Sequence, residues 1–371
     1  DNSLTTAERA QYKAEAKIFR AMVMFDMVRL WGDFPVITTV ADDITSENID
    51  EVYPQYFPKQ NTELEAYQQI EKDLLDAVLY APDNTPGNKT LFSKSVARTL
   101  LAKIYAEKPL RDYTKVIQYC DEVKADGFDL VDDFSDLFGM NAAGTDAKMR
   151  NTKESILEAQ FTSGAGNWCT WMFGRDLVNW NNNFTWAKWV TPSRDLISAF
   201  KQEGDEVRFK ESIVYYDCNW SNYYPSDNYP FMYKCRSANS SIIKYRYADV
   251  LLLKAEALIM QDTPDLEGAA DIIDKVRDRA KLGALPTSVR SNKNVLLNAL
   301  LKERRLELAF EGQRWFDLVR LDKVEEVMNA VYSKDSGRKA QIYTFDKNSY
   351  RLPIPQSVID ANDKIHQNPG Y

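Results

Sequence analysis

Apolar side chains recur at steps of three and four residues along much of the chain, which is the period of an amphipathic helix. The segment 4–33 shows it most clearly. Thr5, followed three residues later by Glu8, predicts a capping box at its start, and Gly32 predicts its end. The apolar stripe of this helix is expected to be Ala14, Ile18, Ala21, Met22, Phe25 and Val28.

Further segments have the same helical period. They lie at 62–81, 93–105, 113–125, 247–260, 266–280 and 294–328. Thr62 and Glu65 repeat the capping-box pattern, and Pro109 and Pro264 each fall between two helices of a pair. Two helices joined by a short turn are typical of tetratricopeptide-like hairpins, although no strict 34-residue period runs through the chain.

The helical period is lost between residues 154 and 246. Short extended or helical pieces are expected there at 154–162, 193–200, 210–217 and 241–247. The remainder is rich in Asn, Gly, Ser and aromatic residues and is expected to be loop. Long irregular segments in a compact domain usually serve a function.

The predicted fold is therefore mainly α: a tetratricopeptide-like helical hairpin scaffold with an irregular, loop-rich region carrying short strands. We expect an N-terminal helical part at 1–153 and a C-terminal part at 154–371. The latter divides into aromatic-rich loops at 154–246 and closing helices at 247–371. Together they are expected to form one compact unit.

Aromatic residues make up 12% of the chain and gather in this irregular region, where residues 166–193 hold five of the eight tryptophans. A sugar ring packs its C–H groups on aromatic faces, while its hydroxyls need amide, carboxylate or guanidinium partners. The expected ligand-binding residues are Trp168, Trp171, Arg175, Asp176, Trp180, Asn181, Asn182, Asn183, Trp186, Trp220, Tyr223 and Tyr224. The alternative is that these aromatic side chains pack under the loops as small satellite cores.

Charge and composition exclude several functions. The net charge of −8 argues against a nucleic-acid binder, and the single histidine, His366, leaves little room for histidine-based catalysis. We expect neither a metal nor a cofactor, because the acidic turns lack the ligand spacing of a calcium loop. Cys218 and Cys235 could form a disulfide in an oxidising compartment, but isolated thiols are favoured.

The densest charge cluster, at 301–321, is treated as one helix. It would place Glu303, Glu307, Glu311 and Arg314 on one side. A glycan-cleaving enzyme would use two of these carboxylates as an acid and base. We favour instead an ion-pair network in which the partners are Arg304, Arg305, Arg314 and Arg320.

Several stretches, in this order over nearly the whole chain, resemble the SusD/RagB family of outer-membrane glycan-binding lipoproteins of Bacteroidota. They are AEAKIFRAMVMFDMVRLWGDFPVI, YQQIEKDLLDAV, SKSVARTLLAKIYAE, RYADVLLLKAEALIM, ADIIDKVRDRA, LLKERRLELAFEGQRWFDLVRL, YRLPIPQSVIDAN and QNPGY. The lipoprotein signal and acylated cysteine of the family are not in this sequence, which opens on Asp1, so we expect an N-terminally truncated member.

The resemblance implies a non-catalytic protein that captures oligo- or polysaccharide at the cell surface. It would pass the ligand to a SusC-like TonB-dependent transporter, held at the outer membrane by a lipid anchor. No nucleic acid is expected as a partner. A helical-repeat adaptor for another protein remains an alternative, and a glycan-cleaving hydrolase is a weaker one.

Overall fold

The first helix begins and ends where its sequence predicts. The computed structural model describes residues 3–161, 166, 191–219, 221–334 and 344–371. In it, α1 spans Thr6–Trp31. Both hydrogen bonds of the Thr5–Glu8 capping box are present, and Gly32 ends the helix at a φ of 73°. The buried stripe is as expected except that Met24 replaces Met22, which is half-buried beside the core.

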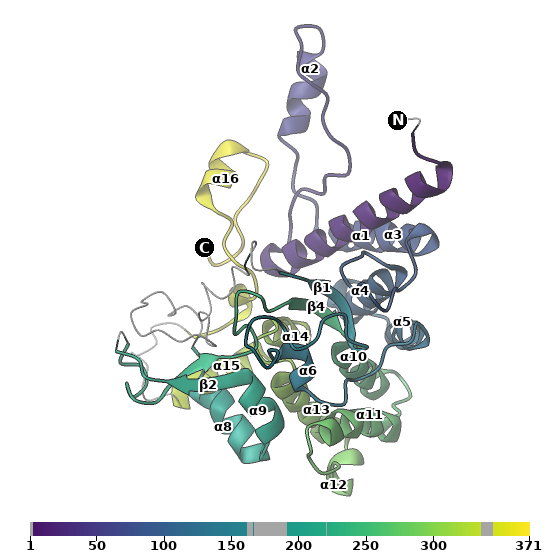
Figure 1. Cartoon of the computed structure of the whole chain (residues 1–371). Helices are drawn as coiled ribbons and strands as arrows, with labels where there is room; N and C mark the ends of the chain where they lie inside the picture. Colours follow the sequence, from purple (N-terminus) through teal and green to yellow (C-terminus); the bar gives the residue numbers. More distant parts are fainter. Residues whose placement is uncertain (1–2, 162–165, 167–190, 220, 335–343) are drawn as a thin grey trace.

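The helices of the scaffold pack in series, each against the next. They are α1, α3 (Glu63–Tyr80), α4 (Lys94–Ala106), α5 (Tyr113–Ala125), α10 (Tyr247–Met260), α11 (Leu266–Arg279) and α13 (Lys293–Glu307). The chain leaves the stack after α5 and returns in α10, which packs on α5 (Figure 1). The expected hairpin scaffold is therefore confirmed, and it joins helices from both ends of the sequence.

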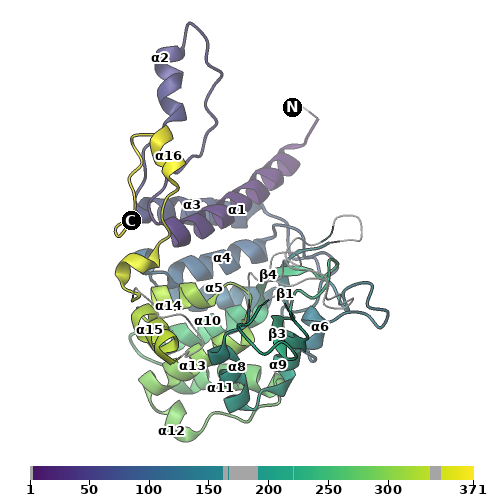
Figure 2. The ribbon, with the colours of Figure 1, turned by 90° about the vertical axis from the view of Figure 1, so that its left-hand side faces the viewer.

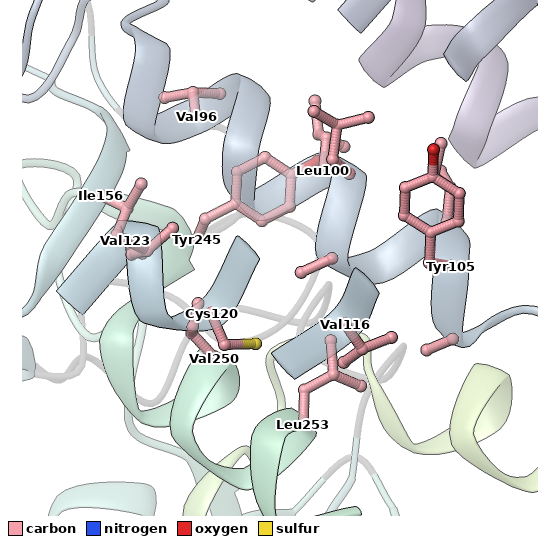
Figure 3. Close-up of a cluster of buried hydrophobic side chains, with 14 of the residues drawn as sticks. Val96, Leu100, Tyr105, Val116, Cys120, Val123, Ile156, Tyr245, Val250 and Leu253 are labelled. Carbon is pink, nitrogen blue, oxygen red and sulfur yellow. The ribbon is translucent and has the colours of Figure 1, made fainter. Parts of the chain in front are cut away.

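One hydrophobic core runs through this stack and reaches the strands. Figure 3 shows Leu100 of α4, Cys120 of α5 and Val250 of α10 meeting Ile156 and Tyr245 from two strands. All five residues are buried. Because the strand residues Ile156 and Tyr245 belong to the same core as the helices, the irregular region is joined to the scaffold by packing as well as by the chain.

The irregular region contains two small antiparallel sheets. Strand β1 (Ser155–Ala159) pairs with β4 (Ile242–Arg246), and β2 (Ile213–Tyr216) pairs with β3 (Tyr229–Met232). Helix α8 (Arg194–Glu203) begins after Ser193 as predicted, and Gly204 ends it. The short helices α6 (Ser135–Phe138) and α9 (Glu206–Ser212) and strand β3 were not predicted.

The single helix predicted over 301–321 is wrong, because the helical region at 294–328 is broken into several helices. Helix α13 ends at Glu307, α14 spans Arg314–Arg320 and α15 spans Val324–Lys334. Phe310 and Gly312 adopt left-handed backbone conformations, with φ of 65° and 75°, which no helix can include. A short helix α12 (Thr287–Arg290) precedes α13.

An arm that the sequence did not predict projects from the end of the stack. It follows α1 and carries α2 (Ile49–Val52) and the 3₁₀ turn η1 (Tyr53–Tyr56), with the C-terminal α16 (Gln356–Ala361) beside its base (Figures 1 and 2). Gln60 and His366 exchange hydrogen bonds of 2.8 and 3.1 Å there. The remaining 3₁₀ turns are η2 (Lys108–Leu110) and η3 (Lys347–Tyr350). Among the described helices, none combines the length and apolarity that a bilayer crossing requires.

Candidate functional site

The predicted ligand-binding residues divide into two groups in the structure. Tyr223 and Tyr224 are described, and they lie together in the loop between β2 and β3. The others lie outside the described residues: Trp168, Trp171, Arg175, Asp176, Trp180, Asn181, Asn182, Asn183, Trp186 and Trp220. The described part of the candidate site therefore consists of the tyrosine pair and the residues around it.

The tyrosine pair borders a surface cavity of about 670 Å³. The rings of Tyr223 and Tyr224 stand perpendicular, with centroids 5.0 Å apart. The described residues lining the cavity are Cys218, Asn219, Ser221, Asn222, Tyr223, Tyr224, Pro225 and Ser226. A volume of this size is in the range of small-molecule sites in proteins.

Arg194 fixes the position of both rings. Ser193 caps α8 by accepting a hydrogen bond from the amide of Leu196, which places Arg194 at the first position of the helix. Its guanidinium carbon lies 4.1 Å from the ring centre of Tyr223 and 4.6 Å from that of Tyr224. It also donates a hydrogen bond to the Tyr223 carbonyl, so the loop is held to the helix by charge as well as by packing.

A buried aromatic layer supports the pair from below. Tyr229 and Phe231 are buried, with ring centroids 5.2 Å apart, and Tyr224 packs edge-on against Tyr229 at 5.6 Å. The Tyr229 hydroxyl lies 3.1 Å from the Ser221 hydroxyl and 3.2 Å from that of Thr191. The aromatic side chains of this region therefore have two roles. Tyr229 and Phe231 of β3 form a satellite core, while Tyr223 and Tyr224 of the loop remain half-exposed above it.

The groups at this cavity suit a neutral polar ligand. Two half-exposed phenol rings provide apolar faces, and the exposed amides of Asn219 and Asn222 provide donors and acceptors beside them. The Tyr224 hydroxyl is already engaged, because it donates to the Pro192 carbonyl at 2.7 Å. The cavity thus combines flat apolar surface with hydrogen-bonding groups at its rim.

The glutamate cluster near residue 307 forms an ion-pair network, as predicted, but with other partners. Glu303 accepts from Arg208 at 2.5 Å, Glu311 accepts from Arg246 at 2.7 Å, and Glu307 is shared by Arg208, Arg246 and Arg279. Neighbouring residues of a helix point in different directions, which is why the adjacent arginines turn elsewhere. The predicted arginine partners Arg304, Arg305 and Arg320 instead pair with Asp249, Asp195 and Glu256, and Arg314 donates to the Leu301 carbonyl.

The electrostatics of this cluster are those of a structural core. Burial alone would raise the pKa of Glu307, but Arg279, Arg246 and Arg208 hold that pKa well below its usual value. Its side chain has no exposed surface. A general acid for glycoside cleavage needs a raised pKa and access to substrate, and Glu307 has neither.

Two further sequence-based expectations concern sulfur and metal. Cys120 and Cys218 are free thiols, so the isolated-thiol interpretation is confirmed for these two and a Cys218–Cys235 bridge is not formed. Among the described residues no group of three or more acidic, histidine or cysteine side chains could hold a metal ion. Asp133 and Asp136 instead pair with Lys148, and Asp132 pairs with Lys153.

The fold and sequence were compared with known proteins. A family model described as the SusD family matches residues 228–371, and another, described as starch-binding and associating with the outer membrane, matches residues 1–106. The SusD-like protein P2 of Formosa agariphila is 28% identical, and the match covers 96% of this chain and 74% of that protein. Both ends of the chain thus match SusD-type family models, and the resemblance to the SusD family is confirmed.

Two other similar proteins have ligands in their names. The starch-binding protein SusD of Bacteroides thetaiotaomicron is 24% identical, over 99% of this chain and 74% of its own. A solved laminarin-binding SusD-like protein superposes with a TM-score of 0.74 at 24% identity, over 100% of this chain and 80% of that one. The superposition shows that the two share a fold.

Proposed function

We propose that this protein binds an oligo- or polysaccharide without cleaving it. The observation that carries the proposal is the cavity at Tyr223 and Tyr224, where Arg194 holds two aromatic rings in place beside exposed amides. A pyranose ring needs both kinds of surface, an apolar face for its C–H groups and polar groups for its hydroxyls. Binding on a preformed surface also avoids the entropic cost of ordering a loop.

The relatives support the same ligand class. One family model is described as starch-binding, a curated relative is named a starch-binding protein, and a protein of the same fold is named as laminarin-binding. Starch and laminarin are both neutral glucans, which differ in linkage. We therefore propose a neutral glycan for this chain and leave its linkage to experiment.

The cellular role follows from the family resemblance. We propose that the protein acts at the outer membrane, held by a lipid anchor, and delivers its glycan to a SusC-like TonB-dependent transporter. The description of the N-terminal family model, which includes association with the outer membrane, supports this location. Co-purification of the full-length protein with its co-expressed transporter would test the partnership, and recovery of each protein alone would contradict it.

The predicted tryptophan platform stays a proposal. The described residues Thr191 and Pro192 lie at the tyrosine cavity, where Thr191 contacts Tyr229 and the Pro192 carbonyl accepts from Tyr224. Trp180 and Trp186 precede these two residues closely in sequence, which supports a shared role for the tryptophans and the tyrosine pair.

Binding to a panel of polysaccharides in affinity gels and by calorimetry tests the proposal. Tyr223→Ala and Tyr224→Ala should each lower the affinity for the best ligand about three- to tenfold, the loss expected when one aromatic contact is removed. Trp180→Ala and Trp186→Ala test the platform in the same assay. Tyr12→Ala, at a tyrosine of α1 that is 54% exposed, is the matched control and should change nothing.

Three results would contradict the proposal. No retention on any polysaccharide would reject glycan binding and favour the helical-repeat adaptor. Unchanged affinity in all four aromatic variants would move the site elsewhere on the protein. Release of shorter products after prolonged incubation with the best ligand would show that the protein is an enzyme.

A further inference from the structure

A second cavity shares no described lining residue with the tyrosine cavity and lies where four parts of the fold meet. It has a volume of about 570 Å³ and lies between the C-terminal half of α1, the short helix α6, the residues from β3 to β4, and the turn between α13 and α14. Its apolar surface includes the rings of Phe138, Phe310 and Phe316 and the side chains of Met232 and Ile242. Three aromatic rings around one space of this size is an arrangement typical of ligand sites.

The backbone of the turn is strained at the cavity wall. Phe310 has a φ of 65°, a left-handed conformation that is sterically unfavourable for a bulky residue. Gly312, two residues on, also has a positive φ but no side chain to strain. Strained residues of this kind concentrate at binding and catalytic sites, where the surrounding packing holds them in place. Here the conformation places Phe310 in the wall of the cavity.

The lining of the cavity includes a half-exposed ion pair. Asp26 of α1 and Lys244 of β4 approach to 2.6 Å, and their side chains are 34% and 37% exposed. They present a hydrogen-bond acceptor and a donor side by side in the lining. Two vicinal hydroxyl groups of a sugar, one donating and one accepting, match such a pair.

The charges around the cavity are compensated by one another. Asp26 also accepts from Arg29 at 2.5 Å, and the Arg29 guanidinium carbon lies 3.9 Å from the ring centre of Phe316. Deeper in, Lys234 pairs with Glu311 at 2.6 Å. A charged ligand would have to compete with these pairs, whereas a neutral ligand leaves them intact.

We propose that this cavity is a second carbohydrate subsite, which takes one neutral sugar unit with its C–H face on the phenylalanine rings and a vicinal diol on Asp26 and Lys244. The proposal rests on the proposed function, because it assumes a glycan ligand. It adds a site whose described lining comes from α1, α6, β3, β4, α14 and the turn at 308–313 and shares no described residue with the tyrosine cavity. A glycan with several units could use both.

The test compares matched variants of two ion pairs. Asp26→Asn and Lys244→Gln remove the charges of the ion pair in the cavity lining. Asp121→Asn and Lys254→Gln alter a control pair of the same chemistry, in which Asp121 of α5 lies 2.5 Å from Lys254 of α10. Calorimetry with the best polysaccharide, and ligand-observed NMR with neutral mono- and disaccharides, would be run on all four and on the unmodified protein. Thermal unfolding would confirm that each variant is folded.

The subsite predicts a loss of affinity of about five- to twentyfold in Asp26→Asn and Lys244→Gln, as expected when a charge-assisted hydrogen bond is replaced by a neutral one, with both controls unchanged. Equal affinity in all variants, with the unmodified protein still binding the polysaccharide, would overturn the subsite and leave the proposed function standing. Absence of any sugar binding by the unmodified protein would reject the proposed function and the subsite with it.

Discussion

Glu307 is a single buried carboxylate that three arginines share. Arg208 reaches it from α9, Arg246 from the end of β4 and Arg279 from the end of α11. None of these side chains is more than 4% exposed. Burying a charge is costly unless it is paired, so each of the four groups is tolerable only because the others are present. One side chain thus ties three separate elements to α13.

Replacing Glu307 should therefore destabilise the whole protein. Glu307→Gln keeps the shape but leaves three guanidinium groups short of a counter-charge, and we expect the free energy of unfolding to fall by about 3–5 kcal/mol. Glu267→Gln is the matched control, since Glu267 is 67% exposed and pairs with Arg290 on the surface. It should change stability by less than about 1 kcal/mol. Equal losses in urea denaturation would show that the network is not what holds these elements.

The turn at 308–313 decides the arrangement of the C-terminal elements. It separates α13 from α14 and brings Glu311, which lies outside both helices, to within 2.7 Å of Arg246. Gly312 permits the turn because glycine adopts a φ of 75° without steric cost. The helical period of 301–321 predicted one continuous helix, and the glycine within it was the signal that this prediction ignored.

A methyl group at this glycine isolates the backbone effect. A Cβ at Gly312 would meet no atom within 4 Å, so Gly312→Ala should cost only the strain of the left-handed conformation, about 1–2 kcal/mol. A Cβ at Gly283 also meets nothing, and the φ of Gly283 lies outside the left-handed range. Gly283→Ala should therefore stabilise by about 0.4–1 kcal/mol. Denaturation of both variants measures the difference, and a neutral Gly312→Ala would show that the turn can rearrange.

At the scale of the whole molecule, buried ion pairs link stability to pH. Burial would by itself raise the pKa values of Asp249 and Asp317, but Lys103 and Arg304 lower the first, and Arg304 and Arg320 lower the second. Arginine side chains lower the pKa of Glu307 in the same way. In the opposite direction, burial raises the pKa values of Glu303 and Asp205. Among the described residues more carboxyl pKa values are lowered than raised, since those of Asp26, Asp133 and Glu203 also lie below their usual values.

A carboxylate whose pKa is lower in the folded state stabilises the protein above its unfolded pKa and loses that contribution as the pH falls. We therefore expect the free energy of unfolding to stay constant from pH 7 to about 5. It should decline below about pH 4–4.5, where the carboxyl groups of the unfolded chain take up protons. Urea denaturation at pH 7, 5, 4 and 3 measures this decline. The gap between the unmodified protein and Glu307→Gln should narrow over the same range. Stability that rises below pH 4 would contradict the assignment.

The sequence alone determined the local features of the fold. Thr5 with Glu8 and Thr62 with Glu65 form the predicted capping boxes, because such caps depend only on residues three apart. The bounds 113–125 and 247–260 match α5 and α10, since their ends are set by local backbone preferences. The family could also be identified from sequence, because its motifs are short and fall in a fixed order.

Only the tertiary structure decided which distant residues meet. Strand β3 has no clear pattern of its own and exists because β2 pairs with it, and Glu307 meets Arg208, Arg246 and Arg279 rather than the arginines beside it in sequence. For the site, composition indicated aromatic residues with amides but could not separate buried Tyr229 from half-exposed Tyr223. The second cavity had no signal in the sequence, because its walls come from α1, β4 and the turn at 308–313, which are far apart along the chain. Caps and helical periods are local, whereas pairing, burial and cavities depend on how separate segments pack.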